Sequence, residues 1–173
     1  MKQSYMDVTT MPGNAISKPA TLLERLKKDY PQLQFMASGR FSWHAGKQHI
    51  SYPEAALQNT RGEWALLHEL GHALLRHTDY TSDMELLHIE IAAWDKAREL
   101  SRNYHVDIDE EYIQDSLDSY RDWLHVRSTC PTCHEHCLQA TRDSYTCHNC
   151  GTSWHVTQSR LCRPYRKTQK KSL

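Results

Sequence analysis

The alternation of apolar and polar residues predicts a short helix and then strands in the first third of the chain. In residues 20–30, three leucines recur at helical spacing among charged side chains, and Pro31 follows them. Residues 33–37 and 40–52 are richer in side chains that favour strands, and Gly-containing turns interrupt them. We therefore expect one amphipathic helix followed by a few strands.

Three longer helical patterns follow, over about residues 60–77, 82–104 and 109–124. Asn59 or Thr60 is suited to cap the first helix. That helix is apolar on all sides, so we expect it to be buried. The third pattern is amphipathic and has an acidic first turn, which suits the positive end of a helix dipole. Together these elements predict an α+β fold with a helical core.

Residues 68–72 read His-Glu-Leu-Gly-His inside the first long helix. Positions i and i+4 of a helix lie about 40° apart, so His68 and His72 can offer their imidazoles to one Zn²⁺. Glu69 lies roughly a quarter of a turn away and is suited to act as a base toward a water at the open metal position. Inside an apolar helix these polar side chains need a partner, which favours a metal site over a solvated surface.

Glu90 is the candidate third protein ligand of this metal. On a helical wheel of residues 82–104 it lies at the centre of the apolar face, where an unpaired carboxylate would cost several kcal/mol. The alternative is a buried carboxylate paired with an Arg or Lys. A zinc ion held by the neighbouring helix needs a third ligand, which favours the metal. His88 falls on the polar face of the same helix.

A second metal site is predicted near the C-terminus. All six cysteines follow residue 129, and two CxxC pairs separated by 13 residues are typical of a structural zinc site in a small β zinc ribbon. About 35 residues cannot bury a sufficient core, so the metal would supply folding energy. The predicted ligands are Cys130, Cys133, Cys147 and Cys150, with Cys137 and Cys162 as spare thiols.

The composition excludes a disordered chain and a membrane-spanning one. Charged residues make up 24% and hydrophobic residues 39% of the chain, as in globular proteins. No apolar run approaches the roughly 18 residues needed to span a membrane, and the N-terminus lacks the apolar segment of a signal peptide. We therefore expect a cytoplasmic protein without membrane contact.

The segment His68–His77 (HELGHALLRH), with Glu90 downstream, resembles the ImmA/IrrE family of zinc metallopeptidases. These gluzincin-like proteins are often linked to phages, mobile elements and stress responses, and some cut or inactivate repressor proteins. The resemblance covers roughly residues 20–125. It implies His68, His72 and Glu90 as zinc ligands and Glu69 as the base. The family's helix often reads Glu-x-Glu-Ala, whereas Ala92 occupies the second Glu position here.

The chain also resembles the SprT-like proteases, which join an HExxH protease to a C-terminal zinc ribbon and act at DNA. Their third zinc ligand is a histidine, and His88 lies at a workable distance downstream. The helical wheel favours Glu90 over His88 because only Glu90 lies on the apolar face. Tyr80, Tyr104 or His105 could stabilise the oxyanion, and the sequence does not select among them.

Charge divides the chain into an acidic part and a basic part. Residues 1–126 hold 13 Lys and Arg against 19 Asp and Glu, whereas residues 127–173 hold 8 against 2. A basic tail is most often solvated, and contact with nucleic acid is the alternative. We predict a flexible leader over 1–18, a metallopeptidase domain over 19–126, a zinc ribbon over 127–163 and a basic tail over 164–173.

The expected function is a zinc endopeptidase with two Zn²⁺ ions, one catalytic and one structural. Its partner would be a protein substrate, such as a repressor or another regulatory protein. DNA or a regulatory protein bound through the basic ribbon is a further expected partner. The alternatives are a SprT-like DNA-associated protease and a catalytically weak zinc-ribbon protein that binds DNA or a partner protein.

Overall fold

The structure is a computed structural model that describes residues 20–157 and 166–168. The predicted leader over 1–18, Cys162 and most of the tail over 164–173 lie outside the described residues. Within the described part of the chain, no helix is both long enough and apolar enough to cross a membrane.

The first helix, α1 (Leu22–Asp29), begins where its sequence provides a capping box. The hydroxyl of Thr21 accepts a hydrogen bond from the backbone N–H of Glu24 at 3.3 Å, and the Glu24 carboxylate accepts one from the backbone N–H of Thr21 at 2.7 Å. The leucines Leu22 and Leu26 are buried on one face. This confirms the predicted amphipathic helix.

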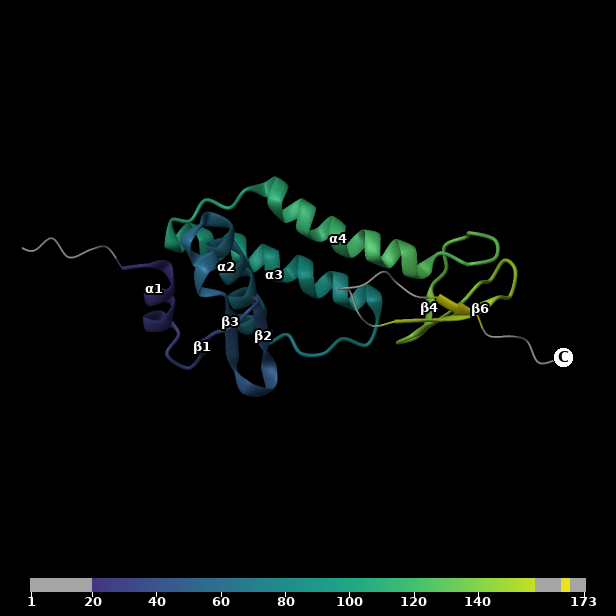
Figure 1. The fold of residues 1–173 in the computed structure, drawn as a ribbon, viewed down its shortest axis with the longest axis horizontal. Coiled ribbons are helices and arrows are strands. Elements are labelled where there is room, and N and C mark those ends of the chain that lie inside the picture. Colours follow the sequence, from purple (N-terminus) through teal and green to yellow (C-terminus); the bar gives the residue numbers. More distant parts are fainter. Residues whose placement is uncertain (1–19, 158–165, 169–173) are drawn as a thin grey trace, which may run out of the picture.

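A three-stranded sheet follows α1 and lies beside the longer helices (Figure 1). Its strands are β1 (Gln34–Ala37), β2 (Ser42–His44) and β3 (His49–Tyr52), in the order β1-β3-β2. Strand β3 pairs parallel with β1 and antiparallel with β2, so β2 forms one edge. The predicted turn around Gly46 is a short 3-10 helix, η1 (Ala45–Lys47).

The three long helices occupy the predicted regions. A second 3-10 helix, η2 (Glu54–Gln58), leads into α2 (Thr60–Leu74), and Asn59 caps α2 by accepting a hydrogen bond from the backbone N–H of Gly62 at 3.0 Å. Next come α3 (Asp83–Tyr104) and α4 (Glu110–Ser128). Helix α2 ends three residues before the predicted end at His77, and α4 continues four residues beyond the predicted end at Leu124.

Helices α3 and α4 lie antiparallel, roughly along the long axis of the molecule (Figure 1). Arg98, late in α3, donates to Glu110 at the start of α4 at 2.9 Å. At the other end, Arg127 donates to Asp83 at 2.8 Å. The end of α3 thus meets the start of α4, and the start of α3 meets the end of α4. The second contact places the C-terminal segment beside the start of α3.

The main core lies between α2, α3, α4, α1 and the small sheet. Its buried members include Leu66, Leu67, Leu70, Trp94, Ala97, Leu100, Ile113, Leu117, Ile50 and Leu26. The expectation that α2 is buried on every side was wrong. Trp64 is only half-buried, although its ring packs edge-on against Tyr112 of α4 at 5.0 Å, and Leu75, which follows α2, is 41% exposed.

The C-terminal segment forms a second, smaller unit, which we call the cysteine module (residues 129–157 and 166–168). Its strands β4 (Gln139–Thr141), β5 (Ser144–Thr146), β6 (Ser153–Val156) and β7 (Arg166–Thr168) form an antiparallel sheet in chain order. Tyr145 stacks on Trp154 with ring centroids 5.5 Å apart, beside the buried Cys130 and Cys147. The predicted α+β fold is confirmed.

Candidate metal sites

Three side chains from α2 and α3 converge in the interior, and all three are buried. His68 Nε2 lies 3.1 Å from His72 Nε2 and 3.2 Å from Glu90 Oε2, while His72 Nε2 lies 3.7 Å from the same oxygen. Helical spacing places both histidines on one face of α2, and the packing of α3 against α2 brings Glu90 to them. The structure therefore groups the three residues that the sequence proposed as ligands.

The spacing of these three atoms suits a zinc ion. Tetrahedral ligands at Zn–N and Zn–O distances of about 2.1 Å lie roughly 3.4 Å from one another, close to the observed 3.1, 3.2 and 3.7 Å. Within the described part of the chain, the buried Oε2 of Glu90 has no hydrogen bond of good geometry. A cation would satisfy this oxygen and remove the need for two imidazole nitrogens to face each other.

The Glu90 carboxyl is held in its charged form despite its position in the core. Burial opposes ionisation, but the adjacent imidazoles of His68 and His72 outweigh it and hold the pKa of Glu90 well below its ordinary value. Two histidines and one carboxylate form a donor set that zinc prefers. The chemistry of the group therefore fits a metal site.

A pocket of about 270 Å³ opens onto these residues. Glu69 is half-buried and lines it beside His68 and His72, so a carboxylate lies close to the ligand group without belonging to it. The strand β2, the α2–α3 connection and α4 complete the wall. Polar and aromatic lining residues from these elements are Ser42, Trp43, His77, Thr78, Tyr80 and Tyr120.

Two neighbours fix the orientation of the histidines. Nδ1 of His72 lies 2.9 Å from Nδ1 of His77, so its outer nitrogen is hydrogen-bonded while Nε2 faces Glu90. Metal-binding histidines are commonly oriented through the second nitrogen in this way. The ring of His68 stacks on Trp94 at 4.2 Å. Helical periodicity could not identify His77, because it lies beyond the end of α2.

His88 and two of the three oxyanion candidates lie away from the candidate metal site. His88 is exposed on α3 and does not belong to the ligand group. Tyr104 donates a hydrogen bond to Asp29 at 2.7 Å and lines a different pocket. His105 is exposed at the end of α3. Of the three residues considered for the oxyanion, only Tyr80 lines the pocket of the candidate metal site.

A close contact between helices sets the distance between the histidines and Glu90. A Cβ atom added to Gly71 would lie 2.5 Å from the carbonyl oxygen of Ala93, which is backbone and cannot rotate away. Gly71 precedes His72, and Ala93 lies one turn after Glu90. The absence of a side chain at Gly71 therefore allows α2 and α3 to approach closely enough to form the ligand group.

We expect Gly71→Ala to lower the free energy of unfolding by about 1–3 kcal/mol, because the methyl group forces the two helices apart. Zinc should also bind more weakly to the His68 group. Urea unfolding and zinc titration measure both effects. Gly46→Ala is the matched control, since an added Cβ meets nothing within 4 Å there. Equal effects of the two substitutions would contradict the proposed close approach.

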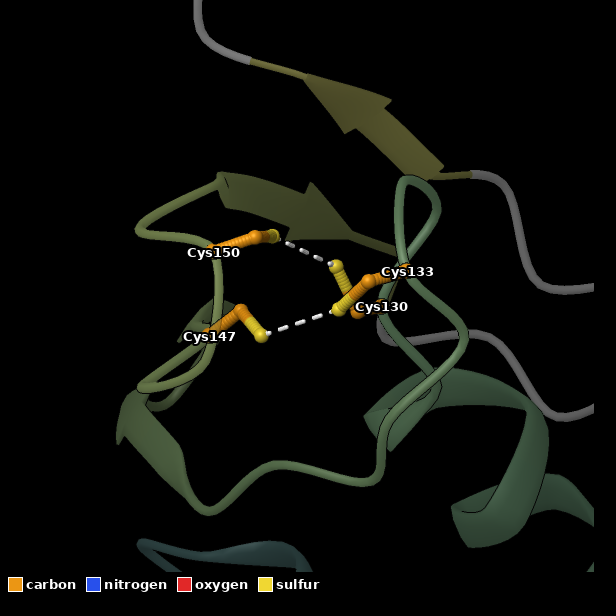
Figure 2. A group of neighbouring side chains, drawn as sticks. All are labelled: Cys130, Cys133, Cys147 and Cys150. Atoms are coloured by element: carbon orange, nitrogen blue, oxygen red, sulfur yellow. Dashed lines mark hydrogen bonds between the residues drawn. The ribbon is translucent and has the colours of Figure 1, made fainter.

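The four predicted thiolates form the second group. Their Sγ atoms point toward one another from two loops of the cysteine module, as Figure 2 shows. Cys130 and Cys150 lie 3.6 Å apart and Cys133 and Cys147 3.5 Å apart, too far for disulfides. Tetrahedral zinc with Zn–S distances of about 2.3 Å places sulfur atoms roughly 3.8 Å apart. The arrangement therefore fits a four-cysteine zinc site.

The two CxxC loops repeat one backbone conformation. The N–H of His134 donates to the carbonyl of Cys130 at 3.1 Å, and the N–H of Gly151 donates to that of Cys147 at 2.9 Å. His134 and Gly151 both have a left-handed conformation, with φ of 64° and 74°. The second loop uses glycine for this turn and the first uses histidine. Both loops thus present their cysteines in the same way.

Donors around the cysteines favour thiolates at particular positions. Hydrogen bonding with the side chain and backbone of Thr152 lowers the pKa of Cys150 to about 6. Burial opposes ionisation of Cys130, but backbone N–H donors, including that of Thr132, lower its pKa. Cys137 is half-buried nearby and is not one of the four grouped thiols.

A buried ion pair joins α4 to α3 where the cysteine module meets both helices. The guanidinium of Arg127 donates to both carboxylate oxygens of Asp83, at 2.8 and 3.1 Å, and the Tyr145 hydroxyl also donates to Asp83. The indole N–H of Trp154 donates to the carbonyl of Arg127 at 3.0 Å. No sequence pattern indicated this pair, because Arg127 and Asp83 resemble ordinary surface charges.

Comparisons of the chain with known protein families, with curated proteins and with solved structures gave no match. The two candidate metal sites and their surroundings are therefore the features that indicate a function.

Proposed function

We propose that this protein is a zinc-dependent endopeptidase that resembles the ImmA/IrrE family. The observation that carries the proposal is the convergence of His68, His72 and Glu90 beside Glu69 in one pocket. In this proposal the first three residues hold the catalytic zinc. The cysteines Cys130, Cys133, Cys147 and Cys150 hold a structural zinc in a zinc ribbon.

Zinc at this position would supply a Lewis acid that activates water and polarises a peptide carbonyl. Glu69 accepts the proton of the attacking water and passes it to the leaving amine. Its half-buried position in the pocket, outside the ligand group, suits a proton carrier rather than a ligand. His77 keeps His72 oriented through the contact at Nδ1.

The edge of the small sheet supports a peptide as the substrate. Strand β2 is an edge strand, and its residues Ser42 and Trp43 line the pocket. An extended peptide can pair with such an edge through backbone hydrogen bonds. A substrate bound in this way would pass close to Glu69. A repressor or another regulatory protein remains the proposed substrate.

The ligand group favours the ImmA/IrrE-like proposal over the SprT-like one. Glu90 is buried beside both histidines, whereas His88 is exposed and lies outside the group. A SprT-like site would require a histidine as third ligand. Binding of DNA through the basic C-terminal residues remains a separate proposal.

The test is hydrolysis of fluorescein-labelled casein by the purified chain. We expect fragments to be released, release to stop with 1,10-phenanthroline, and activity to return when zinc is added. A protein that carries two zinc ions yet leaves casein and a mixed peptide library intact would contradict the endopeptidase proposal. That result would favour a zinc-containing binding protein instead.

Elemental analysis should find close to two zinc ions per chain. The two ligand groups come from separate parts of the chain and share no residue, so each should load independently. Cys130→Ser should lower the content to about one, because it removes a buried thiolate ligand. The control is Cys137→Ser, which should keep two. A Cys130→Ser protein with unchanged zinc content would refute the ribbon site.

A further inference from the structure

One arginine of the cysteine module contacts the connection between α2 and α3. Arg142, in the turn between β4 and β5, donates to Asp79 Oδ1 at 2.9 Å, and its guanidinium lies 5.6 Å from the ring centroid of Tyr80. The same Asp79 oxygen accepts the backbone N–H of Tyr80 at 3.1 Å. Arg142 thus contacts both the carboxylate of Asp79 and the aromatic ring of Tyr80.

The other end of the connection is held by the same hairpin. The side-chain oxygen of Gln139 accepts the backbone N–H of Asp83 at 2.7 Å, and its amide N–H donates to the carbonyl of Arg142 at 2.7 Å. The carboxylate of Asp83 is fixed by Arg127 and Tyr145. Residues 79–83 are therefore attached at both ends to the cysteine module.

Tyr80 is the residue of this segment that can act on a substrate. It is half-buried and lines the pocket together with His68, Glu69 and Glu90. Burial and then the nearby Asp83 carboxylate raise the pKa of Tyr80, so its phenol keeps its proton and remains a hydrogen-bond donor. Tyr120 also lines the pocket, but it comes from α4 rather than from the held segment.

We propose that Arg142 is a positioning residue through which the cysteine module holds Tyr80 in the pocket, where the Tyr80 phenol donates a hydrogen bond to the carbonyl oxygen of the bound peptide. The inference rests on the proposed endopeptidase function. It gives the four-cysteine site a role in the reaction, since a module that loses its metal would release the segment that carries Tyr80.

The first experiment measures amide hydrogen exchange of residues 78–83 and does not depend on activity. Arg142→Ala should raise exchange there about tenfold while leaving α2 unchanged. Arg121→Ala is the matched control, because Arg121 is an exposed arginine of α4 paired with Asp118 at 2.6 Å. Both arginines pair at the surface, so neither change should shift Tm by more than a few degrees. Unchanged exchange in Arg142→Ala would overturn the positioning role.

The second experiment measures hydrolysis of a quenched fluorescent peptide built on a casein cleavage site. Tyr80→Phe should lower kcat about 10- to 100-fold with little change in KM, because the lost donor acts in the transition state. Tyr30→Phe is the control, because Tyr30 is half-buried and lines a different pocket, and it should change kcat by less than about threefold. Arg142→Ala should lower kcat about fivefold, and Arg142→Lys should recover part of the loss by restoring the pairing with Asp79.

A double variant distinguishes action through Tyr80 from a general structural effect. If Arg142 acts through Tyr80, Arg142→Ala should cost almost nothing further in the Tyr80→Phe background. If the two losses of kcat instead multiply in the double variant, Arg142 does not act through Tyr80 and the inference is wrong. If the unaltered protein hydrolyses no peptide, the endopeptidase proposal fails and the role of Tyr80 in the reaction fails with it. Amide exchange would still decide whether Arg142 holds the segment.

Discussion

Glu69→Gln should lower peptide hydrolysis by about 10²- to 10⁴-fold while the protein keeps both zinc ions. Gln has the size of Glu but cannot accept a proton, and general acid–base groups typically contribute a factor of this order. Glu69 lies in the pocket but outside the ligand group, so metal binding should be unaffected. The measurements are the rate of casein cleavage and the zinc content of the same preparation.

The matched control is Glu63→Gln. Glu63 belongs to the same helix but lines a different pocket, beside Leu22 and Tyr52. This variant should cleave casein at nearly the rate of the unaltered protein. If Glu69→Gln also keeps that rate, Glu69 is not the proton carrier. If it loses one zinc ion, Glu69 takes part in metal binding and the proposed ligand set is wrong.

Glu90→Ala should release the zinc of the His68 group and abolish hydrolysis, leaving about one zinc ion per chain. The side chain supplies one of three converging ligand atoms, and alanine offers no replacement. The control is His88→Ala on the same helix. His88 is exposed, so its removal should change the free energy of unfolding by no more than about 0.5 kcal/mol.

The pair of variants also separates the two family resemblances. Loss of the catalytic zinc in Glu90→Ala alone supports the ImmA/IrrE-like site. Loss in His88→Ala alone would contradict the observed grouping and favour a SprT-like ligand set. Thermal unfolding of both variants shows whether a loss of zinc follows from a loss of fold, because the four-cysteine zinc should remain in a folded Glu90→Ala protein.

The local features of both metal sites could be predicted from the sequence because they depend on short-range geometry. A spacing of four residues places His68 and His72 on one helical face whatever the rest of the fold. The wheel of α3 identified Glu90 because a charge in the middle of an apolar face needs a partner. The two CxxC loops are compact, and their spacing alone predicted that four thiols would meet.

The extent of burial of α2 could not be read from its composition. An apolar helix is buried only where other elements cover it, and one side of α2 near Trp64 is only half covered. Likewise, the position of Gly71 within the motif carried no sign of its role. Only the packing of α3 showed that a side chain there would meet the backbone of Ala93.

The helices, the α+β class and the two groups of ligand-bearing residues could be predicted without the structure, because each follows from periodicity or from short spacing. Tertiary structure alone decided which distant residues support them. Arg127 looked like the first residue of a basic, exposed region, yet it is fully buried against Asp83, 44 positions earlier. Arg142 likewise meets Asp79 and Tyr80 across more than 60 positions. Such pairs depend on how the helices and the cysteine module pack, and no local pattern encodes that packing.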